Sequence, residues 1–233
     1  MKEFLAVDDI RDSGAWQAAI AEFVATFGFV FLGLGAVAFA AGNILIVALA
    51  HGLAITLFII ALGRVSGGHI NPAVTVAAVV TQRMGLTKGL MYVVGQLGGA
   101  ALGAFTLAAF LEGSGIELST HNLANGLEPF KGIIVEAVLT FFLVFTVIAV
   151  AMDPRGSAKL APFAIGFIVL VDHFVGVPLT GASMNPARSF GPALAAGEWA
   201  NHWVYWVGPI IGSIVAAVFY ELVFVRWNSK ETA

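Results

Sequence analysis

The sequence has 233 residues, of which 59% are hydrophobic and only 11% are charged, whereas a soluble domain carries about 25% charged residues. Together with a mean hydropathy of +0.94, this composition predicts a membrane protein. The net charge of −3, without a basic patch, argues against a nucleic-acid partner. The absence of cysteine excludes disulfides and thiolate metal sites.

Six apolar stretches are long enough to cross a bilayer, which takes about 20 residues in a helix. They cover residues 16–41, 44–63, 88–111, 130–152, 160–179 and 202–225. Residues 1–12 lack the cationic start and the cleavage site of a signal peptide. We therefore expect the first stretch to be retained, and all six to be helices that satisfy their own backbone polar groups.

Two shorter apolar stretches, residues 71–80 and 185–196, each begin with Asn-Pro-Ala: Asn71-Pro72-Ala73 and Asn185-Pro186-Ala187. Asn is a favoured N-cap and Pro a favoured first helical residue. Each stretch therefore predicts a half-helix that starts inside the protein. Glycine-containing segments precede both, and irregular backbone at membrane depth is tolerated where it lines a cavity.

The two halves of the chain match in one register, 114 positions apart. The matching pairs are Glu22 and Glu136, Thr26 and Thr140, Phe27 and Phe141, Gly67 and Gly181, and the two Asn-Pro-Ala triplets. Because each half has three spans, the second half must enter the membrane from the opposite side. We expect one all-α membrane domain over residues 1–233, with six transmembrane helices, two re-entrant half-helices and inverted repeats at roughly 15–113 and 129–226.

The basic residues support this topology if both termini are cytoplasmic. The cytoplasmic side then carries Lys2, Arg11, Arg64, Arg83, Lys88, Arg155, Lys159, Arg226 and Lys230. Only Lys131 and Arg188 fall on the other side. This distribution agrees with the tendency of cytoplasmic loops to be positively charged, and it marks Arg188 as a charge with another purpose.

The two half-helices would meet tip to tip near the middle of the membrane. Each helix N-terminus carries roughly +0.5 elementary charge, which repels cations. The side-chain amides of Asn71 and Asn185 could both donate hydrogen bonds to one passing water. The preceding segments would offer backbone carbonyls as acceptors, from Gly67, Gly68, His69, Gly181 and Ser183. This pattern predicts water passage without proton transfer, although each Asn-Pro could simply cap a helix.

Three further residues carry charge into the predicted membrane region. Arg188 lies three residues after Asn185, where its charge would exclude cations, unless it reaches out to the outer interface. Glu22 and Glu136 are interpreted as structural acceptors for the turns before the half-helices, in preference to a proton relay.

Glycines at four-residue spacing predict close helix packing. These glycines are Gly95, Gly99, Gly103, Gly208 and Gly212.

These motifs resemble those of the major intrinsic proteins, the aquaporin family. The segments SGGHINPAVT (66–75) and GASMNPARSFGPA (181–193) look like the two signature loops of that family, and the similarity covers roughly residues 15–226. The resemblance implies a passive channel that is surrounded by lipid, forms a homotetramer and needs no cofactor. An enzyme is not expected, because no nucleophile with an adjacent base, metal-ligand spacing or phosphate loop is present.

The resemblance also implies a selectivity filter made of His51, His173, Ala182 and Arg188. His173, Arg188 and the serine at position 189 are similar to the water-selective branch. His51 stands where that branch usually has Phe, and with residues 202–209 it resembles the tonoplast intrinsic proteins of plants. His121 resembles an extra filter histidine of ammonia-permeable members, with a solvated loop residue as the alternative.

Water is therefore the expected permeant, and ammonia or other small neutral solutes are the alternative. A structural membrane protein with a vestigial pore is a third possibility. Because histidine changes charge near neutral pH, we expect acidification to alter the flux. The compact loops favour a prokaryotic cytoplasmic membrane, with a vacuolar membrane as the alternative.

Overall fold

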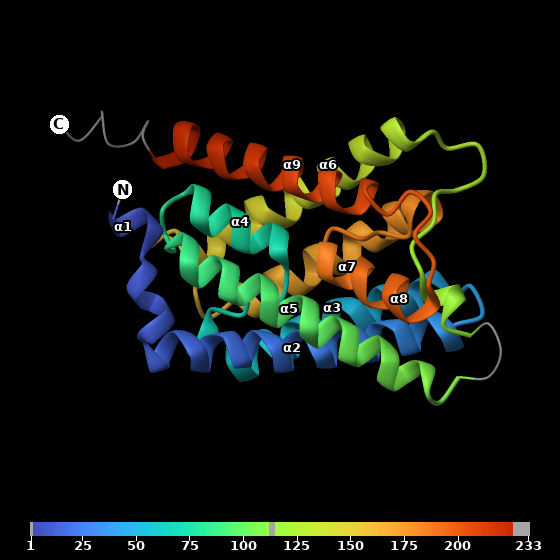
Figure 1. Ribbon diagram of the computed structural model, residues 1–233. Helices are drawn as coiled ribbons and strands as arrows, with labels where there is room; N and C mark the ends of the chain where they lie inside the picture. Colours follow the sequence, from blue (N-terminus) through green and yellow to red (C-terminus); the bar gives the residue numbers. More distant parts are fainter. Residues whose placement is uncertain (1, 112–114, 226–233) are drawn as a thin grey trace.

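A computed structural model describes residues 2–111 and 115–225, and this part of the chain is helical without strands (Figure 1). Six helices are long and apolar enough to cross a membrane. They are α2 (Ser13–Phe39), α3 (Ile44–Ser66), α5 (Leu86–Ala108), α6 (Pro129–Val147), α7 (Ala161–Thr180) and α9 (Val204–Tyr220). The predicted class, an all-α membrane protein with six spans, is confirmed.

Shorter helical segments lie at the ends of these spans. α6 and α9 continue as π-helical turns, η3 (Ile148–Met152) and η4 (Glu221–Val225). α1 (Lys2–Leu5) and η1 (Val7–Arg11) precede the first span, and η2 (Glu117–Ser119) lies between α5 and α6. Arg226 and Lys230, which the predicted topology places on the cytoplasmic side, lie outside the described residues.

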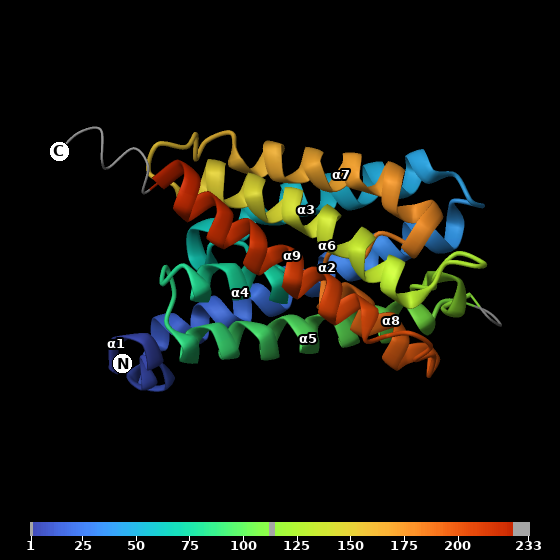
Figure 2. The ribbon, with the colours of Figure 1, turned by 90° about the horizontal axis from the view of Figure 1, so that it is seen from above.

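The two half-helices are α4 (Pro72–Val80) and α8 (Pro186–Ala196). Asn71 and Asn185 are their N-caps, and Pro is the first residue of each helix. They occupy opposite halves of the bundle, with α4 nearer to the chain termini and α8 farther away (Figures 1 and 2). Both half-helices thus start inside the protein, as their sequences predict.

The packing follows the inverted repeat. α2 packs against α5 in the first half, and α6 packs in the same way against α9 in the second. α3 and α7 meet across the two halves. Each half-helix also contacts the last helix of the other half, α4 against α9 and α8 against α5. This exchange holds the two half-helix N-termini toward the centre of the bundle.

Several predicted helix boundaries are wrong by two or three residues, and two of them have an identifiable reason. α2 begins at Ser13 and not at residue 16, because the Asp12 carboxylate accepts hydrogen bonds from the backbone N–H groups of Gly14 and Ala15, at 3.1 and 2.9 Å. α3 continues past residue 63 to Ser66, and it ends where Gly67 adopts a φ of 93°.

Glycines allow the helix backbones to approach closely, as expected for membrane helices. A Cβ atom added to Gly99 of α5 would lie 2.2 Å from the carbonyl oxygen of Phe23 in α2. A Cβ on Gly212 of α9 would lie 2.1 Å from the carbonyl oxygen of Ala137 in α6. The glycine repeats therefore lie in the two helix contacts that define each half.

Candidate functional site

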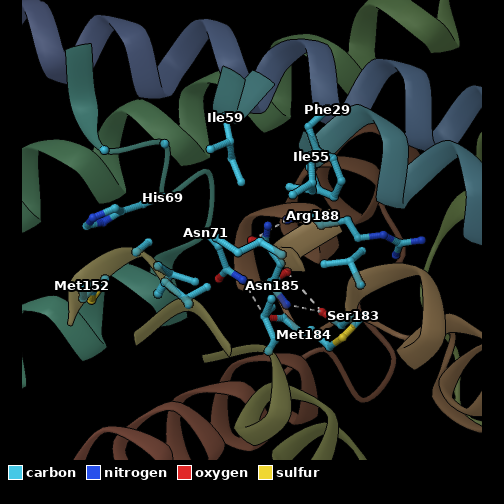
Figure 3. A pocket seen from close by; sticks show the side chains of 18 of the residues that line it. Phe29, Ile55, Ile59, His69, Asn71, Met152, Ser183, Met184, Asn185 and Arg188 are labelled. Carbon is cyan, nitrogen blue, oxygen red and sulfur yellow. Dashed lines mark hydrogen bonds between the residues drawn. The ribbon is translucent and has the colours of Figure 1, made fainter. Parts of the chain in front are cut away.

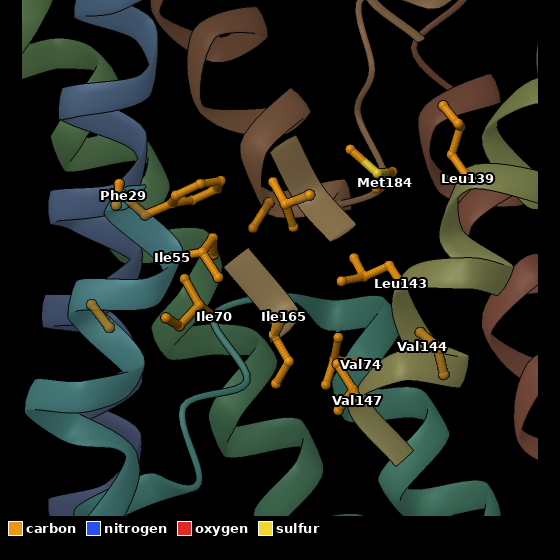
Figure 4. Packing of buried hydrophobic residues seen from close by; sticks show 14 of the residues in the cluster. Phe29, Ile55, Ile70, Val74, Leu139, Leu143, Val144, Val147, Ile165 and Met184 are labelled. Carbon is orange, nitrogen blue, oxygen red and sulfur yellow. The ribbon is translucent and has the colours of Figure 1, made fainter. Parts of the chain in front are cut away.

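A cavity of about 150 Å³ lies between the tips of the two half-helices (Figure 3). Its polar wall is formed by Gly67, Gly68, His69, Asn71, His173, Ser183, Asn185 and Arg188. Its apolar wall includes Phe29, Ile55, Val74, Leu143, Val147 and Ile165 (Figure 4). His69 and Met152 lie toward one end and Arg188 toward the other. The cavity where the half-helices meet therefore has one apolar wall and one wall of polar groups.

The side chain of each N-cap asparagine forms a hydrogen bond with the backbone of the other half of the protein. The Asn71 amide nitrogen donates a hydrogen bond to the Met184 carbonyl at 2.8 Å, and the Asn185 amide nitrogen donates to the Ile70 carbonyl at 2.9 Å. The Asn71 side-chain oxygen accepts from the N–H of Ala73. Because an amide nitrogen has two hydrogens, each asparagine keeps one donor for the cavity. One donor from each asparagine is what the predicted double hydrogen bond to a passing water requires.

The buried carboxylates organise the irregular segments before the half-helices. Glu136 accepts hydrogen bonds from the Thr180 hydroxyl at 2.6 Å and from the backbone N–H groups of Ser183 and Met184 at 2.9 and 2.7 Å. Glu22 accepts the corresponding bonds from Ser66, His69 and Ile70, and another from the Gln96 amide. These bonds agree with the interpretation of both glutamates as structural acceptors, because a buried carboxylate needs hydrogen-bond donors around it.

Arg188 separates the central cavity from a second cavity of about 390 Å³, which we call the vestibule and which is lined by Glu117, Ser119, Thr120, His121, Asn122 and Gly181 among others. Of the described residues that line these two cavities, Arg188 alone lines both. Only 2% of its surface is exposed. Its Nε donates to Nε2 of His51 at 3.0 Å, and a guanidinium nitrogen lies 3.2 Å from Nδ1 of His121.

The predicted filter residues are all buried. His173 lines the central cavity, with its Nδ1 bonded to the Val169 carbonyl at 2.7 Å. His51 accepts the hydrogen bond from Arg188, and its ring centroid lies 4.5 Å from that of His173. Ala182 is fully buried and packs toward Gly176. That His51 and Ala182 form the aperture together with His173 and Arg188 stays a prediction.

His121 is not a solvated loop residue, because only 7% of its surface is exposed. Its ring lies 5.0 Å from that of Tyr205, and its Nδ1 contacts the Ser189 hydroxyl at 2.7 Å. Burial, together with the nearby positive charge of Arg188, holds the pKa of His121 well below its ordinary value. The loop between α5 and α6 thus brings a neutral imidazole to Arg188.

Sequence reasoning missed several polar contacts near this site. Ser189 and Ser183, each named above for another reason, have hydroxyl groups 2.5 Å apart. Gln96, which sequence reasoning did not single out, donates to Thr75 at 3.0 Å. Asp172 lies beside His173 in α7 with 5% of its surface exposed, and its Oδ2 has no hydrogen-bond partner among the described residues. The signal for Asp172 was available, because a carboxylate within an apolar span calls for an explanation.

Comparison with known proteins decides the family. Residues 9–220 match the family model described as Major intrinsic protein. The chain belongs to this family. It is 43% identical over 235 residues to Aquaporin TIP4-4 of Zea mays, covering 96% of this chain and 92% of that protein. It is also 43% identical over 225 residues to Aquaporin-4 of Mus musculus, covering 90% of this chain and 68% of that protein.

A solved structure agrees with this assignment. The X-ray structure of the aquaglyceroporin from Plasmodium falciparum superposes with a TM-score of 0.83 at 26% identity, covering 93% of this chain and 99% of that chain. The protein is therefore a multi-pass membrane channel of the aquaporin type and not an enzyme. The two aquaporin relatives come from a plant and a mammal, so the expectation of a prokaryotic membrane is not confirmed.

Proposed function

We propose that the protein conducts water passively and excludes protons and other ions. The observation that carries this proposal is the pair of bonds from Asn71 to Met184 and from Asn185 to Ile70, at 2.8 and 2.9 Å. These bonds fix both amides in the central cavity and leave one N–H on each for a passing water. Because its oxygen accepts from the amides, that water is oriented with both of its hydrogens away from them.

Ion exclusion follows from the positive charge along the same path. The N-termini of α4 and α8 each contribute roughly half an elementary charge, and Arg188 adds a full charge where the central cavity meets the vestibule. The apolar wall offers no acceptors to replace the hydration shell of an ion, so partial dehydration is costly. A neutral water meets a smaller barrier than a cation does.

Ammonia is the second candidate, and the position of His121 favours it. A neutral imidazole beside Arg188 adds a polar group at the entrance from the vestibule. Ammonia has an acceptor lone pair and three donors, so it can exchange hydrogen bonds with Arg188 and a histidine as water does. This candidate predicts ammonia flux in addition to water flux.

The proposal also includes the oligomeric state of the protein and the membrane in which it lies. Long apolar side chains are exposed on the outer faces of α2, α3, α6 and α7, among them Ile20, Leu53, Phe142 and Phe167. These faces suit lipid or copies of the same chain, and we expect the homotetramer typical of the family. A vacuolar membrane is the proposed location, because a relative is named TIP and His51 and His121 resemble tonoplast proteins.

The test is a permeability panel on purified protein in liposomes, with stopped-flow measurement of water, glycerol, urea and ammonia flux. We expect rapid water flux, little glycerol or urea flux, and no dissipation of a proton gradient. Arg188→Ala should admit protons or cations, whereas Thr146→Val, which removes an exposed hydroxyl that bonds to its own helix, should behave as wild type. Absence of water flux from folded protein would instead support a vestigial pore.

A further inference from the structure

A chain of side-chain contacts links the start of α8 to the loop that carries His121. The Ser183 hydroxyl lies 3.1 Å from the Asn185 carbonyl and 2.5 Å from the Ser189 hydroxyl. Ser189 lies 2.7 Å from Nδ1 of His121, and that nitrogen is also 3.2 Å from a guanidinium nitrogen of Arg188. All of these groups are buried.

The available hydrogens do not satisfy all of these contacts at once. Each serine hydroxyl has one hydrogen, and Nδ1 of a neutral histidine either carries a hydrogen or accepts one. If Ser183 donates to the Asn185 carbonyl, then Ser189 must donate to Ser183. His121 must then donate from Nδ1 to Ser189. The N–H at Nδ1 and a guanidinium N–H of Arg188 are then two donors that face each other without an acceptor between them.

The opposite direction removes this conflict. Ser183 then donates to Ser189, and the single lone pair on Nδ1 of His121 is shared between the Ser189 hydroxyl at 2.7 Å and the guanidinium N–H of Arg188 at 3.2 Å. The bond that is given up is the longest of the three hydroxyl contacts, at 3.1 Å. The Asn185 carbonyl keeps its bond from the Ser189 backbone N–H at 3.2 Å. A hydrogen bond to a charged donor is also worth more than a neutral one, so this direction is favoured.

We propose that Ser189 is a positioning residue that seats His121 beside Arg188 and fixes it as the tautomer protonated at Nε2. This inference rests on the proposed channel function and deepens it by naming what sets the filter chemistry. His121 then presents an N–H on the ring edge that lies against Gly181, where an added Cβ would lie 2.6 Å from the ring. Nε2 of His121 is itself buried and has no hydrogen-bond partner among the described residues, so Arg188, which lines both cavities, supplies the donor on the path.

The tautomer can be read without any transport measurement. Solid-state NMR of protein labelled with nitrogen-15 histidine, in liposomes, separates the two ring tautomers, and His121→Ala assigns the signal. We expect the Nε2-protonated form in the wild type and in Ser189→Thr, which keeps the hydroxyl. Ser183→Ala is the matched control for this readout, because Ser189 can still donate to His121 in that variant. A wild-type signal from the Nδ1-protonated form would overturn the proposal. Because Arg188 still contacts Nδ1 in Ser189→Ala, the readout in that variant is the nitrogen-15 shift of Nδ1, and a shift identical to that of the wild type would also overturn the proposal.

Transport gives the second readout. The loss of one hydrogen bond of ordinary strength should release His121 and raise the ratio of glycerol to water permeability about fivefold in Ser189→Ala. Ser189→Thr should restore the wild-type ratio, and Ser189→Ala should add nothing in a His121→Ala background. An equal increase in both backgrounds would mean that Ser189 does not act through His121. If the wild type conducts no water, the channel proposal fails while the tautomer result still decides this one.

Discussion

Nε of Arg188 donates a hydrogen bond to Nε2 of His51 at 3.0 Å, and thereby joins the charged residue of α8 to α3 of the other half. Nδ1 of His51 contacts the Val47 carbonyl at 2.8 Å, so this nitrogen carries the hydrogen and Nε2 is the acceptor. A neutral histidine at this position therefore supports Arg188 in addition to the filter role that the family resemblance implies.

His51→Phe should lower the stability of the protein, because it leaves a buried guanidinium N–H without its acceptor. Such a loss costs roughly 1–3 kcal/mol. The thermal unfolding midpoint in detergent should fall, and the restraint on Arg188 should weaken. His51→Gln, which can offer an acceptor from a similar distance, should recover part of the loss. Equal stability of wild type and His51→Phe would show that the bond contributes nothing.

Asn71→Asp should damage ion exclusion more than water flux. The carboxylate can still accept from the N–H of Ala73, as the asparagine oxygen does at 2.8 Å. When ionised, however, it has no donor for the Met184 carbonyl or for a passing water, and it places a negative charge beside two positive helix ends. A pH-sensitive dye inside liposomes should report faster proton entry.

The control for this variant is Asn201→Asp, which makes the same change of charge at an exposed residue with a φ of 52°. It should leave the proton barrier intact. If both variants leak protons equally, the effect comes from surface charge and not from the central asparagine.

Titration of His121 should cause no change in water flux between pH 8 and pH 5. Burial, and after it the charge of Arg188, holds the pKa of this histidine well below its ordinary value, which favours the neutral form where a free histidine would take up a proton. This lowered pKa argues against the acid switch that the histidine content suggested. A flux change with a midpoint in this range that disappears in His121→Ala would contradict the prediction.

Acid should instead reduce stability through the same residue. The unfolded chain takes up a proton at a histidine pKa of about 6.5, whereas the pKa of His121 in the folded protein is lower. The unfolded state therefore binds more protons at low pH, and the free energy of unfolding falls as the pH drops below about 6.5. In His121→Ala, the unfolding midpoint measured at pH 8 and pH 5 should differ less than in the wild type.

Gly99→Ala should destabilise the contact of α2 with α5. The added Cβ would lie 2.2 Å from the Phe23 carbonyl oxygen, which belongs to a helix backbone and cannot move aside cheaply. We expect a loss of about 1–3 kcal/mol and a lower yield of folded protein. Gly98→Ala is the matched control, because its Cβ would meet only the Phe23 ring, at 3.3 Å. Similar yields for both variants would argue against the close backbone contact.

Much of the architecture could be predicted because the membrane imposes it. Span length, the Asn-Pro-Ala capping signals and the offset of 114 between Glu22 and Glu136 each have a direct physical meaning in lipid. The ends of the spans depend on local side-chain and backbone detail. Asp12 starts α2 early through side-chain capping, and α3 continues beyond Arg64 to a left-handed glycine.

The filter could not be worked out to the same depth, because it depends on side chains from four separate segments. Spacing along the chain cannot show that His51 accepts a hydrogen bond from Arg188, or that one amide hydrogen of Asn71 is donated to the Met184 carbonyl. Ser189 was noticed only as a marker of the water branch, and its contact with His121 crosses 68 positions in sequence. Such contacts appear only when the loop is placed on the helices.

The most direct test of the account is simultaneous measurement of water and proton flux through the wild-type protein in one liposome preparation. Stopped-flow light scattering follows the water, and an enclosed pH-sensitive dye follows the protons. The paired asparagines and Arg188 predict water flux well above that of empty liposomes, with proton flux no greater than theirs. Proton entry that rises together with the water flux would contradict the account.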